Sequence, residues 1–171
     1  MEKEILFSKE AIAGRVRELA AEISRDCAGR DLVVIGILKG AFVFMADLIR
    51  ALEVPCTVDF TQLASYGSGT VSSGSIVIKK DIGIGIEGKD VLVVEDIVDT
   101  GLTLDFLVRT LRERRPRSLK VCVFLDKRMR RKVPFTADYT GFAIDDGFVV
   151  GYGLDCNEQD RSLPEVYVIK E

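Results

Sequence analysis

The sequence predicts an α/β fold in which helices flank a mostly parallel sheet. Continuous apolar runs are typical of strands buried on both faces of such a sheet, and they occur here at residues 32–38, 91–94 and 119–125. Segments with helical spacing of their apolar residues follow the first two runs. The 171 residues, 47% hydrophobic and 30% charged, fit one globular domain, residues 1–171, with a sizeable core.

Composition excludes several classes of function. A net charge of −3 argues against non-specific binding of nucleic acid, which needs a basic surface. The chain has no apolar run near the roughly 20 residues of a membrane span. The start, Met1 to Glu4, lacks the layout of a signal peptide. We therefore expect a cytoplasmic protein with no nucleic-acid or membrane partner.

The reactive side chains narrow the chemistry. The four cysteines are widely spaced, which favours free thiols over disulfides or a zinc site: Cys27, Cys56, Cys122 and Cys156. The chain has no histidine, so Ser-His-Asp and Cys-His nucleophiles and a histidine general base are excluded. Any proton transfer falls to a carboxylate, lysine, tyrosine or water.

The first elements are a helix, a strand and a second helix. Ser8 can cap a helix over residues 8–27, and Gly29 suits its end. The apolar run at 32–38 is the first predicted strand. Lys39-Gly40 follows it, and residues 41–52 read as a helix.

A strand and a long polar loop come next. Residues 56–64 begin with the alternation of a half-buried strand, and residues 65–75 contain three Gly and five Ser. A linker between domains is one explanation of this loop. Because an apolar run resumes at residues 76–78, we favour a mobile loop within one domain, of the kind that often serves as a lid.

Two glycine motifs at residues 83–89 are rejected as phosphate sites. Gly83 to Gly88 fits Gly-x-Gly-x-x-Gly, and with Lys89 it nearly fits a P-loop. Both motifs must follow a strand and open a helix, whereas this segment leads directly into the strand at Val91. It is predicted to be a surface connection.

The stretch at residues 91–104 carries the candidate site. Its apolar run ends in two carboxylates, Glu95 and Asp96, and the turn Asp99-Thr100-Gly101 then opens a helix. In open α/β sheets, ligands bind at the carboxyl ends of strands, and free N–H groups at a helix start suit phosphate. A buried strand with a capped turn is the plain alternative, but it gives no reason for the paired carboxylates. Phosphate, hydroxyl and metal ligands within one turn indicate a sugar-phosphate site.

The last third of the chain adds a strand at 119–125, followed by Asp126-Lys127-Arg128 on the ligand side of the sheet. Residues 134–171 contain short apolar pieces at 148–150 and 166–169, separated by glycines and acidic residues. We expect them to form a small cap over the sheet edge rather than a second domain.

The stretch 91–104 closely resembles the phosphoribosyl-pyrophosphate-binding motif of the phosphoribosyltransferases, and the turn Leu38-Lys39-Gly40 resembles their pyrophosphate-contacting turn, whose Leu-Lys peptide is cis in some members. The resemblance implies the type I phosphoribosyltransferase fold with a small C-terminal hood. It assigns Ser65 and Tyr66 to the start of a lid. The residues it implies for binding phosphoribosyl pyrophosphate are Lys39, Gly40, Glu95, Asp96, Asp99, Thr100, Gly101, Leu102, Thr103 and Arg161.

Residues 121–128 and 148–158, with Arg161, resemble the 6-oxopurine branch, the hypoxanthine and hypoxanthine-guanine phosphoribosyltransferases. Lys127 can donate to the 6-oxygen, Phe148 can stack on the purine, and the backbone of Val149 can pair with the base edge. Taken singly, each has a plain alternative as a core, surface or turn residue, but their joint spacing favours binding. Asp155 is implied beside the base, and Mg²⁺ is implied with Glu95, Asp96 and Asp155 as ligands.

The implied reaction displaces pyrophosphate from ribose C1 by a purine nitrogen, with Asp99 accepting a proton from the purine. Glu95 and Asp96 are implied to hold the ribose hydroxyls. A transferase for another base, or a non-catalytic regulator on the same fold, is the alternative. A regulator is expected to lack the catalytic group or to carry a basic face, and Asp99 and the net charge of −3 argue against it. We also expect a homo-oligomer, either a dimer or a tetramer.

Overall fold

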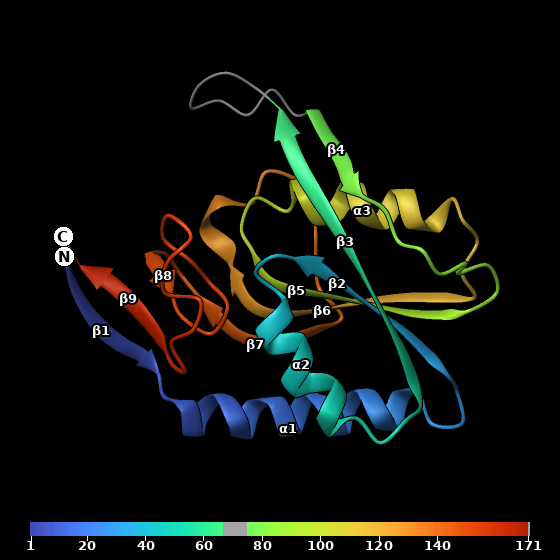
Figure 1. Cartoon of the computed structure of the whole chain (residues 1–171), viewed down its shortest axis with the longest axis horizontal. Coiled ribbons are helices and arrows are strands. Elements are labelled where there is room, and N and C mark those ends of the chain that lie inside the picture. Colours follow the sequence, from blue (N-terminus) through green and yellow to red (C-terminus); the bar gives the residue numbers. More distant parts are fainter. Residues whose placement is uncertain (67–74, 171) are drawn as a thin grey trace.

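A computed structural model describes residues 1–66 and 75–170 of the chain (Figure 1). Its elements, in chain order, are β1 (Glu2–Phe7), α1 (Lys9–Asp26), β2 (Leu32–Leu38), α2 (Phe42–Ala51), β3 (Cys56–Tyr66), β4 (Ser75–Lys80), β5 (Asp90–Val98), α3 (Leu102–Arg112), β6 (Ser118–Lys127), the 3-10 turn η1 (Arg128–Arg130), β7 (Tyr139–Ile144), β8 (Phe148–Val150) and β9 (Val166–Lys170).

The main sheet has six strands in the order β4-β3-β2-β5-β6-β7. All neighbouring pairs are parallel except β3 and β4, which are antiparallel. The chain passes from β2 outward to β3 on one side, and from β5 outward to β6 on the other. The order of strands therefore reverses between β2 and β5, which is the point where open α/β sheets bind ligands. This confirms the predicted fold class.

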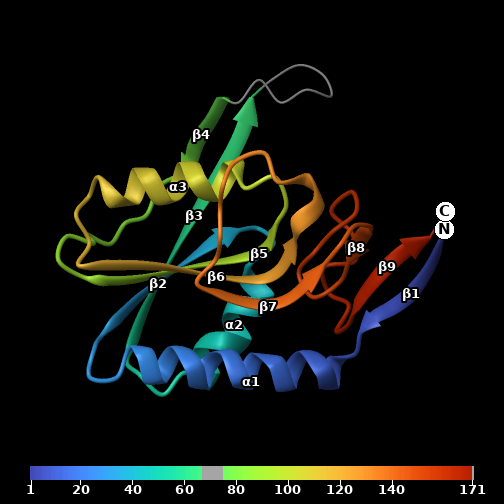
Figure 2. The same cartoon turned by 180° about the vertical axis from the view of Figure 1, so that it is seen from behind.

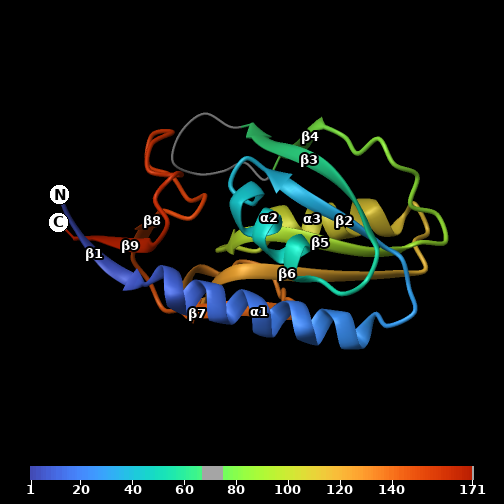
Figure 3. The ribbon, with the colours of Figure 1, turned by 60° about the horizontal axis from the view of Figure 1, so that its bottom comes forward.

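Helices cover both faces of this sheet (Figure 2). Helices α1 and α2 lie on one face and α3 lies on the other, as the tilted view of Figure 3 also shows. Each central strand contributes side chains to the cores on both faces of the sheet, because successive side chains point to opposite faces. In β5, Leu92 and Val94 pack toward α1 and α2, whereas Val91 and Val93 pack toward α3. Burial on both faces explains why these strands read as continuous apolar runs.

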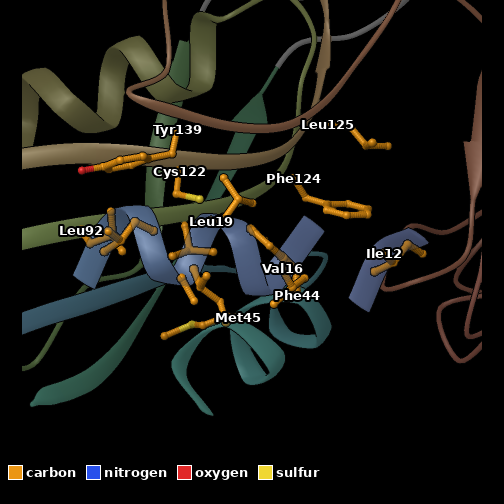
Figure 4. Packing of buried hydrophobic residues seen from close by; sticks show 14 of the residues in the cluster. Ile12, Val16, Leu19, Phe44, Met45, Leu92, Cys122, Phe124, Leu125 and Tyr139 are labelled. Atoms are coloured by element: carbon orange, nitrogen blue, oxygen red, sulfur yellow. The ribbon is translucent and has the colours of Figure 1, made fainter. Parts of the chain in front are cut away.

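The larger core lies under α1 and α2 (Figure 4). Apolar side chains of α1, such as Val16 and Leu19, meet Phe44 and Met45 of α2 beneath Phe124 of β6. Ser8 caps α1 as predicted, because its Oγ accepts a hydrogen bond from the N–H of Ala11 at 3.2 Å.

The cap differs from the expectation. A second sheet, ordered β1-β9-β8, contains the N-terminal strand as well as the two C-terminal ones, and the two ends of the chain lie together (Figure 1). The prediction of a purely C-terminal cap was therefore incomplete. Strand β7, which also falls within residues 134–171, joins the main sheet beside β6. Strand β1 is mostly exposed, and backbone pairing with β9 holds it together with Phe7, whose ring stacks on Phe142.

Several boundaries are settled by the sheet. Ser65 and Tyr66 continue β3, paired with Ile76 and Ser75 of β4, so they belong to a strand end rather than to the loop. The rest of the predicted lid, residues 67–74, lies outside the described residues. Within the described part of the chain, no helix is long and apolar enough to cross a membrane.

The rejected glycine motif is a surface connection between β4 and β5, as predicted. The backbone N–H groups of Gly83 and Ile84 donate to one oxygen of the Asp59 carboxylate, at 2.7 and 2.9 Å. These amides serve to fasten the segment to β3, and none of them opens a helix.

Candidate active site

The predicted site residues meet where β2 and β5 end, at the reversal of strand order. Lys39 and Gly40 follow β2, and the Leu38-Lys39 peptide is cis. Glu95 and Asp96 lie within the last residues of β5, which runs on to Val98 rather than stopping at the carboxylates. A Cβ placed on Gly153 would overlap the carbonyl oxygen of Gly40, so the segment after β8 packs directly on the turn after β2.

Glu95 and Asp96 are neighbouring carboxylates, of which Glu95 is buried and Asp96 is half-buried. The backbone N–H of Asp96 donates to Glu95 Oε1 at 2.9 Å, and that of Ile97 donates to Asp96 Oδ1 at 2.8 Å. Burial raises the pKa of Glu95 well above its usual range, and the adjacent Asp96 carboxylate raises it further. Burial likewise raises the pKa of Asp96. Two adjacent acids that resist ionisation form a site suited to hydroxyl groups or a cation.

The turn between β5 and α3 lines a cavity of about 250 Å³, together with the two carboxylates. Gly101 starts α3 with φ +84°, and no side chain among the described residues caps this helix. The N–H of Leu102 makes a long bond of 3.3 Å to Thr100 Oγ1. Backbone donors and the positive end of the α3 dipole therefore remain available to an anion beside Thr103.

The other side of this turn rests on the segment after β6. The N–H of Lys132 donates to the carbonyl of Thr100 at 2.8 Å, and the side chains of Arg131 and Phe135 approach Gly101 closely. Arg131 is itself paired with the buried Asp126. The segment after β6 thus supports one side of the turn, and the other side of the turn faces the cavity.

A second cavity of about 300 Å³ adjoins the first and shares Asp96, Ile97 and Asp99 with it. Its other lining residues include all four that the sequence assigned to the base: Lys127, Phe148, Val149 and Asp155. Phe148 is 52% exposed, which leaves a ring face open to a ligand, whereas Val149 is buried. Asp99 stands between the two cavities, and its Oδ1 is buried without a hydrogen-bond partner in the described residues.

Lys127 is buried at the end of β6, with its Nζ 3.6 Å from Asp146 Oδ1. Arg130 also approaches Asp146, at 3.8 Å. The backbone N–H of Gly147 and these two cations hold the pKa of Asp146 below its usual range. The contact fixes the lysine at the mouth of the second cavity. The sequence did not identify Asp146, because no local pattern of residues links it to Lys127.

Arg161 and Lys39, both predicted to bind pyrophosphate, come from distant segments and meet through Glu158. Arg161 donates to the carbonyl of Gly153 at 2.7 Å and lies 3.4 Å from Asp155. Lys39 Nζ donates to Glu158 at 2.7 Å, and Arg161 donates to the same carboxylate at 3.2 Å. Sequence reasoning did not identify Glu158, since its partner Lys39 is 119 residues away.

The three predicted metal ligands do not form a ready-made cage. Within residues 1–66 and 75–170, no three His, Cys, Asp or Glu residues gather closely enough to hold a metal ion. Glu95 and Asp96 are adjacent in the chain, whereas Asp155 lines the second cavity and accepts a hydrogen bond from the N–H of Glu158. Mg²⁺ keeps several waters and takes few protein ligands, so it does not require such a cage.

Comparison with known proteins identifies the family. A family model described as the phosphoribosyl transferase domain matches residues 3–157. The hypoxanthine-guanine phosphoribosyltransferase of Aquifex aeolicus is 51% identical over 98% of this chain and 94% of its own length, and that of Bacillus subtilis is 45% identical over 98% and 93%. A crystal structure of the Bacillus anthracis hypoxanthine-guanine phosphoribosyltransferase, with HEPES in its active site, aligns with a TM-score of 0.95 and 48% identity, covering 99% of this chain and 100% of that one.

Proposed function

The chain belongs to the phosphoribosyl transferase family, and from this premise we infer that it transfers the phosphoribosyl group of phosphoribosyl pyrophosphate to a 6-oxopurine. The acceptors are hypoxanthine and guanine, the products are IMP or GMP and pyrophosphate, and the activity belongs to purine salvage. Identities of 51% and 45% to named hypoxanthine-guanine phosphoribosyltransferases over nearly the whole chain support it. We assign all of residues 1–171 to one phosphoribosyltransferase domain.

One observation links this function to specific residues: Asp99 lies between two adjoining cavities that are lined by different kinds of side chain. The first cavity has carboxylates and a helix start, which suit ribose hydroxyls and a phosphate. The second has a buried lysine and an open aromatic ring, which suit an oxopurine. A sugar phosphate and a base placed in the two cavities would meet beside the Asp99 carboxylate.

The binding roles follow from this arrangement. We assign the 5′-phosphate to Asp99–Thr103, with Thr100, Gly101, Leu102 and Thr103 offering backbone or hydroxyl donors, and the ribose hydroxyls to Glu95 and Asp96. Lys39, Gly40 and Arg161 would hold the pyrophosphate. Lys127 would donate to the purine 6-oxygen, with Phe148 stacking, Val149 pairing through its backbone and Asp155 at the edge of the base.

The chemical step forms a bond between a purine nitrogen and ribose C1 and breaks the bond from C1 to the pyrophosphate oxygen. The purine nitrogen loses its proton as it attacks, and Asp99 is positioned to accept it. The Asp99 Oδ1 atom is buried and has no hydrogen-bond partner among the described residues, so it is available for that proton.

We propose Mg²⁺ as the cofactor, with Glu95, Asp96 and Asp155 as its protein contacts, directly or through water. The ion would supply positive charge that neutralises the departing pyrophosphate. The raised pKa values of Glu95 and Asp96 fit this proposal, because a bound cation stabilises the ionised form that burial disfavours.

The proposal also covers the location of the enzyme, its oligomeric state and a lid. We propose a cytoplasmic homo-oligomer, a dimer or tetramer. A structure of the Trypanosoma cruzi hypoxanthine phosphoribosyl transferase, 45% identical with a TM-score of 0.92, was determined to study its own oligomeric state. That Ser65 and Tyr66 start a lid remains a prediction.

The test is a turnover assay of the purified protein with phosphoribosyl pyrophosphate, Mg²⁺ and each of five bases: hypoxanthine, guanine, xanthine, adenine and uracil. Turnover of hypoxanthine and guanine is expected. Turnover of xanthine or uracil alone would indicate a transferase for another base. No turnover of any base would favour a non-catalytic regulator on this fold.

A further inference from the structure

A carboxylate occupies the pyrophosphate side of the site, and the reaction gives it no role. Glu158 lies between Lys39 and Arg161, and each of its oxygens accepts a hydrogen bond from one of them. The distances are 2.7 Å from Lys39 Nζ to Oε2 and 3.2 Å from Arg161 Nη2 to Oε1. Two oxygens of one anion thus engage the same two cations that a phosphate group of pyrophosphate would engage.

The backbone holds Glu158 in place. Its N–H donates to Asp155 Oδ2 at 2.9 Å, and its φ of +64° follows one of +52° at Asn157. Residues other than glycine adopt this left-handed conformation rarely, and they keep it where neighbouring contacts enforce it. Arg161 is fixed independently by the Gly153 carbonyl. The meeting of the carboxylate with the two cations is therefore built into this segment of the chain.

The contact is nonetheless easy to displace. The side chains of Glu158 and Lys39 are 61% and 56% exposed, whereas that of Arg161 is 18% exposed, so solvent reaches the carboxylate in both ion pairs. Ion pairs open to solvent are individually weak. A pyrophosphate carries more negative charge than one carboxylate and can therefore replace it on both cations.

We propose that Glu158 is a positioning residue that occupies the place of the pyrophosphate on Lys39 and Arg161 when the site is free. This rests on the proposed function, which assigns pyrophosphate to those two cations. Phosphoribosyl pyrophosphate must displace the carboxylate on binding, and the carboxylate returns to the cations as pyrophosphate leaves. Glu158 thereby weakens the binding of the substrate's pyrophosphate end and assists release of the product.

The experiment is calorimetric titration of magnesium pyrophosphate into the parent protein and Glu158→Gln, which keeps the shape of the side chain and removes its charge. The dissociation constant is expected to fall about fivefold, the order that two partly exposed ion pairs contribute. The KM for phosphoribosyl pyrophosphate should fall in parallel, with the KM for hypoxanthine and the melting temperature unchanged.

Two further variants separate contact from overall charge. Glu18→Gln removes an equally exposed carboxylate that is paired with Arg15 at 2.9 Å on α1, and it should leave the dissociation constant unchanged. Glu158→Asp keeps the charge but shortens the side chain, so it should give an intermediate constant. A parent-like or weaker affinity in Glu158→Gln would overturn the inference, as would an equal gain in Glu18→Gln.

The outcome also separates this inference from the proposed function. A parent protein that turns over no base would overturn the function itself. A parent protein that turns over hypoxanthine, paired with a Glu158→Gln variant of unchanged pyrophosphate affinity, would overturn only the role of Glu158.

Discussion

Gly40, in the turn after β2, lies directly against the side chain of Asp96 at the end of β5. A Cβ placed on Gly40 would overlap the Asp96 carboxylate, with Oδ2 the nearest atom. The turn after β2 and the end of β5 are therefore packed so that a position without a side chain faces one acid. Any side chain at position 40 must move that acid or the turn itself.

Gly40→Ala should damage the site more than the fold. Displacing the Asp96 carboxylate should raise the KM for phosphoribosyl pyrophosphate and lower kcat, and overpacking of this kind costs roughly 1–3 kcal/mol. Steady-state kinetics and thermal unfolding would measure both effects. Gly85→Ala is the matched control, because nothing lies within 4 Å of a Cβ there. Parent-like kinetics in Gly40→Ala would show that the site tolerates the displacement.

Asp99→Asn tests the proton acceptor. The amide keeps the shape of the side chain but cannot take the purine proton, so turnover should fall by roughly 10²–10⁴-fold, the usual contribution of general acid–base catalysis. Binding of phosphoribosyl pyrophosphate should persist. Asp105→Asn, on the exposed side of α3 and paired with Arg109, should keep parent turnover. Near-parent turnover in Asp99→Asn would leave Asp99 as a turn residue only.

Lys127 should decide the choice of base. A lysine only donates, so it suits the 6-oxygen of hypoxanthine and guanine and meets the 6-amino group of adenine donor to donor. Discrimination against adenine should reach about 10⁴–10⁵, as in sites where a buried polar group is left unpaired. Lys127→Ala should reduce this discrimination because it slows the turnover of hypoxanthine and guanine. Lys120→Ala, on the same strand, should leave the discrimination unchanged. Use of adenine by the parent protein would contradict the assignment.

Glu95→Gln should stabilise the free protein while it impairs function. Because the folded state raises the pKa of Glu95, the folded protein binds more protons than the unfolded chain above the usual pKa of 4.5. Ionisation therefore costs stability as the pH rises. The variant should melt higher at neutral pH, by about 2–4 °C for each kcal/mol regained, with the difference vanishing below pH 4.5.

The same variant should bind phosphoribosyl pyrophosphate with Mg²⁺ more weakly than the parent, since it lacks a charged ligand. Calorimetric titration beside thermal unfolding would measure both effects. A lower melting temperature at pH 7 would show that the carboxylate supports the fold rather than the site.

Asp90, at the opposite end of β5, should contribute to acid stability. It is 1% exposed, and hydrogen bonds from Arg117 and from Ser118 at 2.6 Å lower its pKa from 3.8 to about 2. Its stabilising effect is complete above the unfolded pKa of 3.8 and is lost as the pH falls through about 2. Asp90→Asn should cost about 1–2 kcal/mol at neutral pH.

Thermal unfolding of the parent protein and Asp90→Asn as a function of pH would measure this contribution. The difference between the two proteins should shrink as the pH falls below 4. A difference that stays constant with pH would assign the effect to packing rather than to the charge of Asp90.

The sequence by itself determined strands β2, β3, β5 and β6 of the main sheet, the helices α1, α2 and α3, and the turn between β5 and α3. Strands β2, β5 and β6 were predicted because burial on both faces requires continuous apolar residues, which are visible locally. Glu95 to Thr103 could be identified because these residues are contiguous, so one strand end and one helix start bring them together without any distant contact. Ser8 could be identified as a cap for the same reason.

Tertiary structure alone decided the features that join distant segments. Strand β1 exists because its backbone pairs with β9 at the other end of the chain, and its exposed residues show no strand pattern. Glu158 meets Lys39 only because the turn after β2 packs against the segment after β8, through Gly40 and Gly153. Such contacts depend on how elements approach in space, and the local spacing of residue types does not encode that approach.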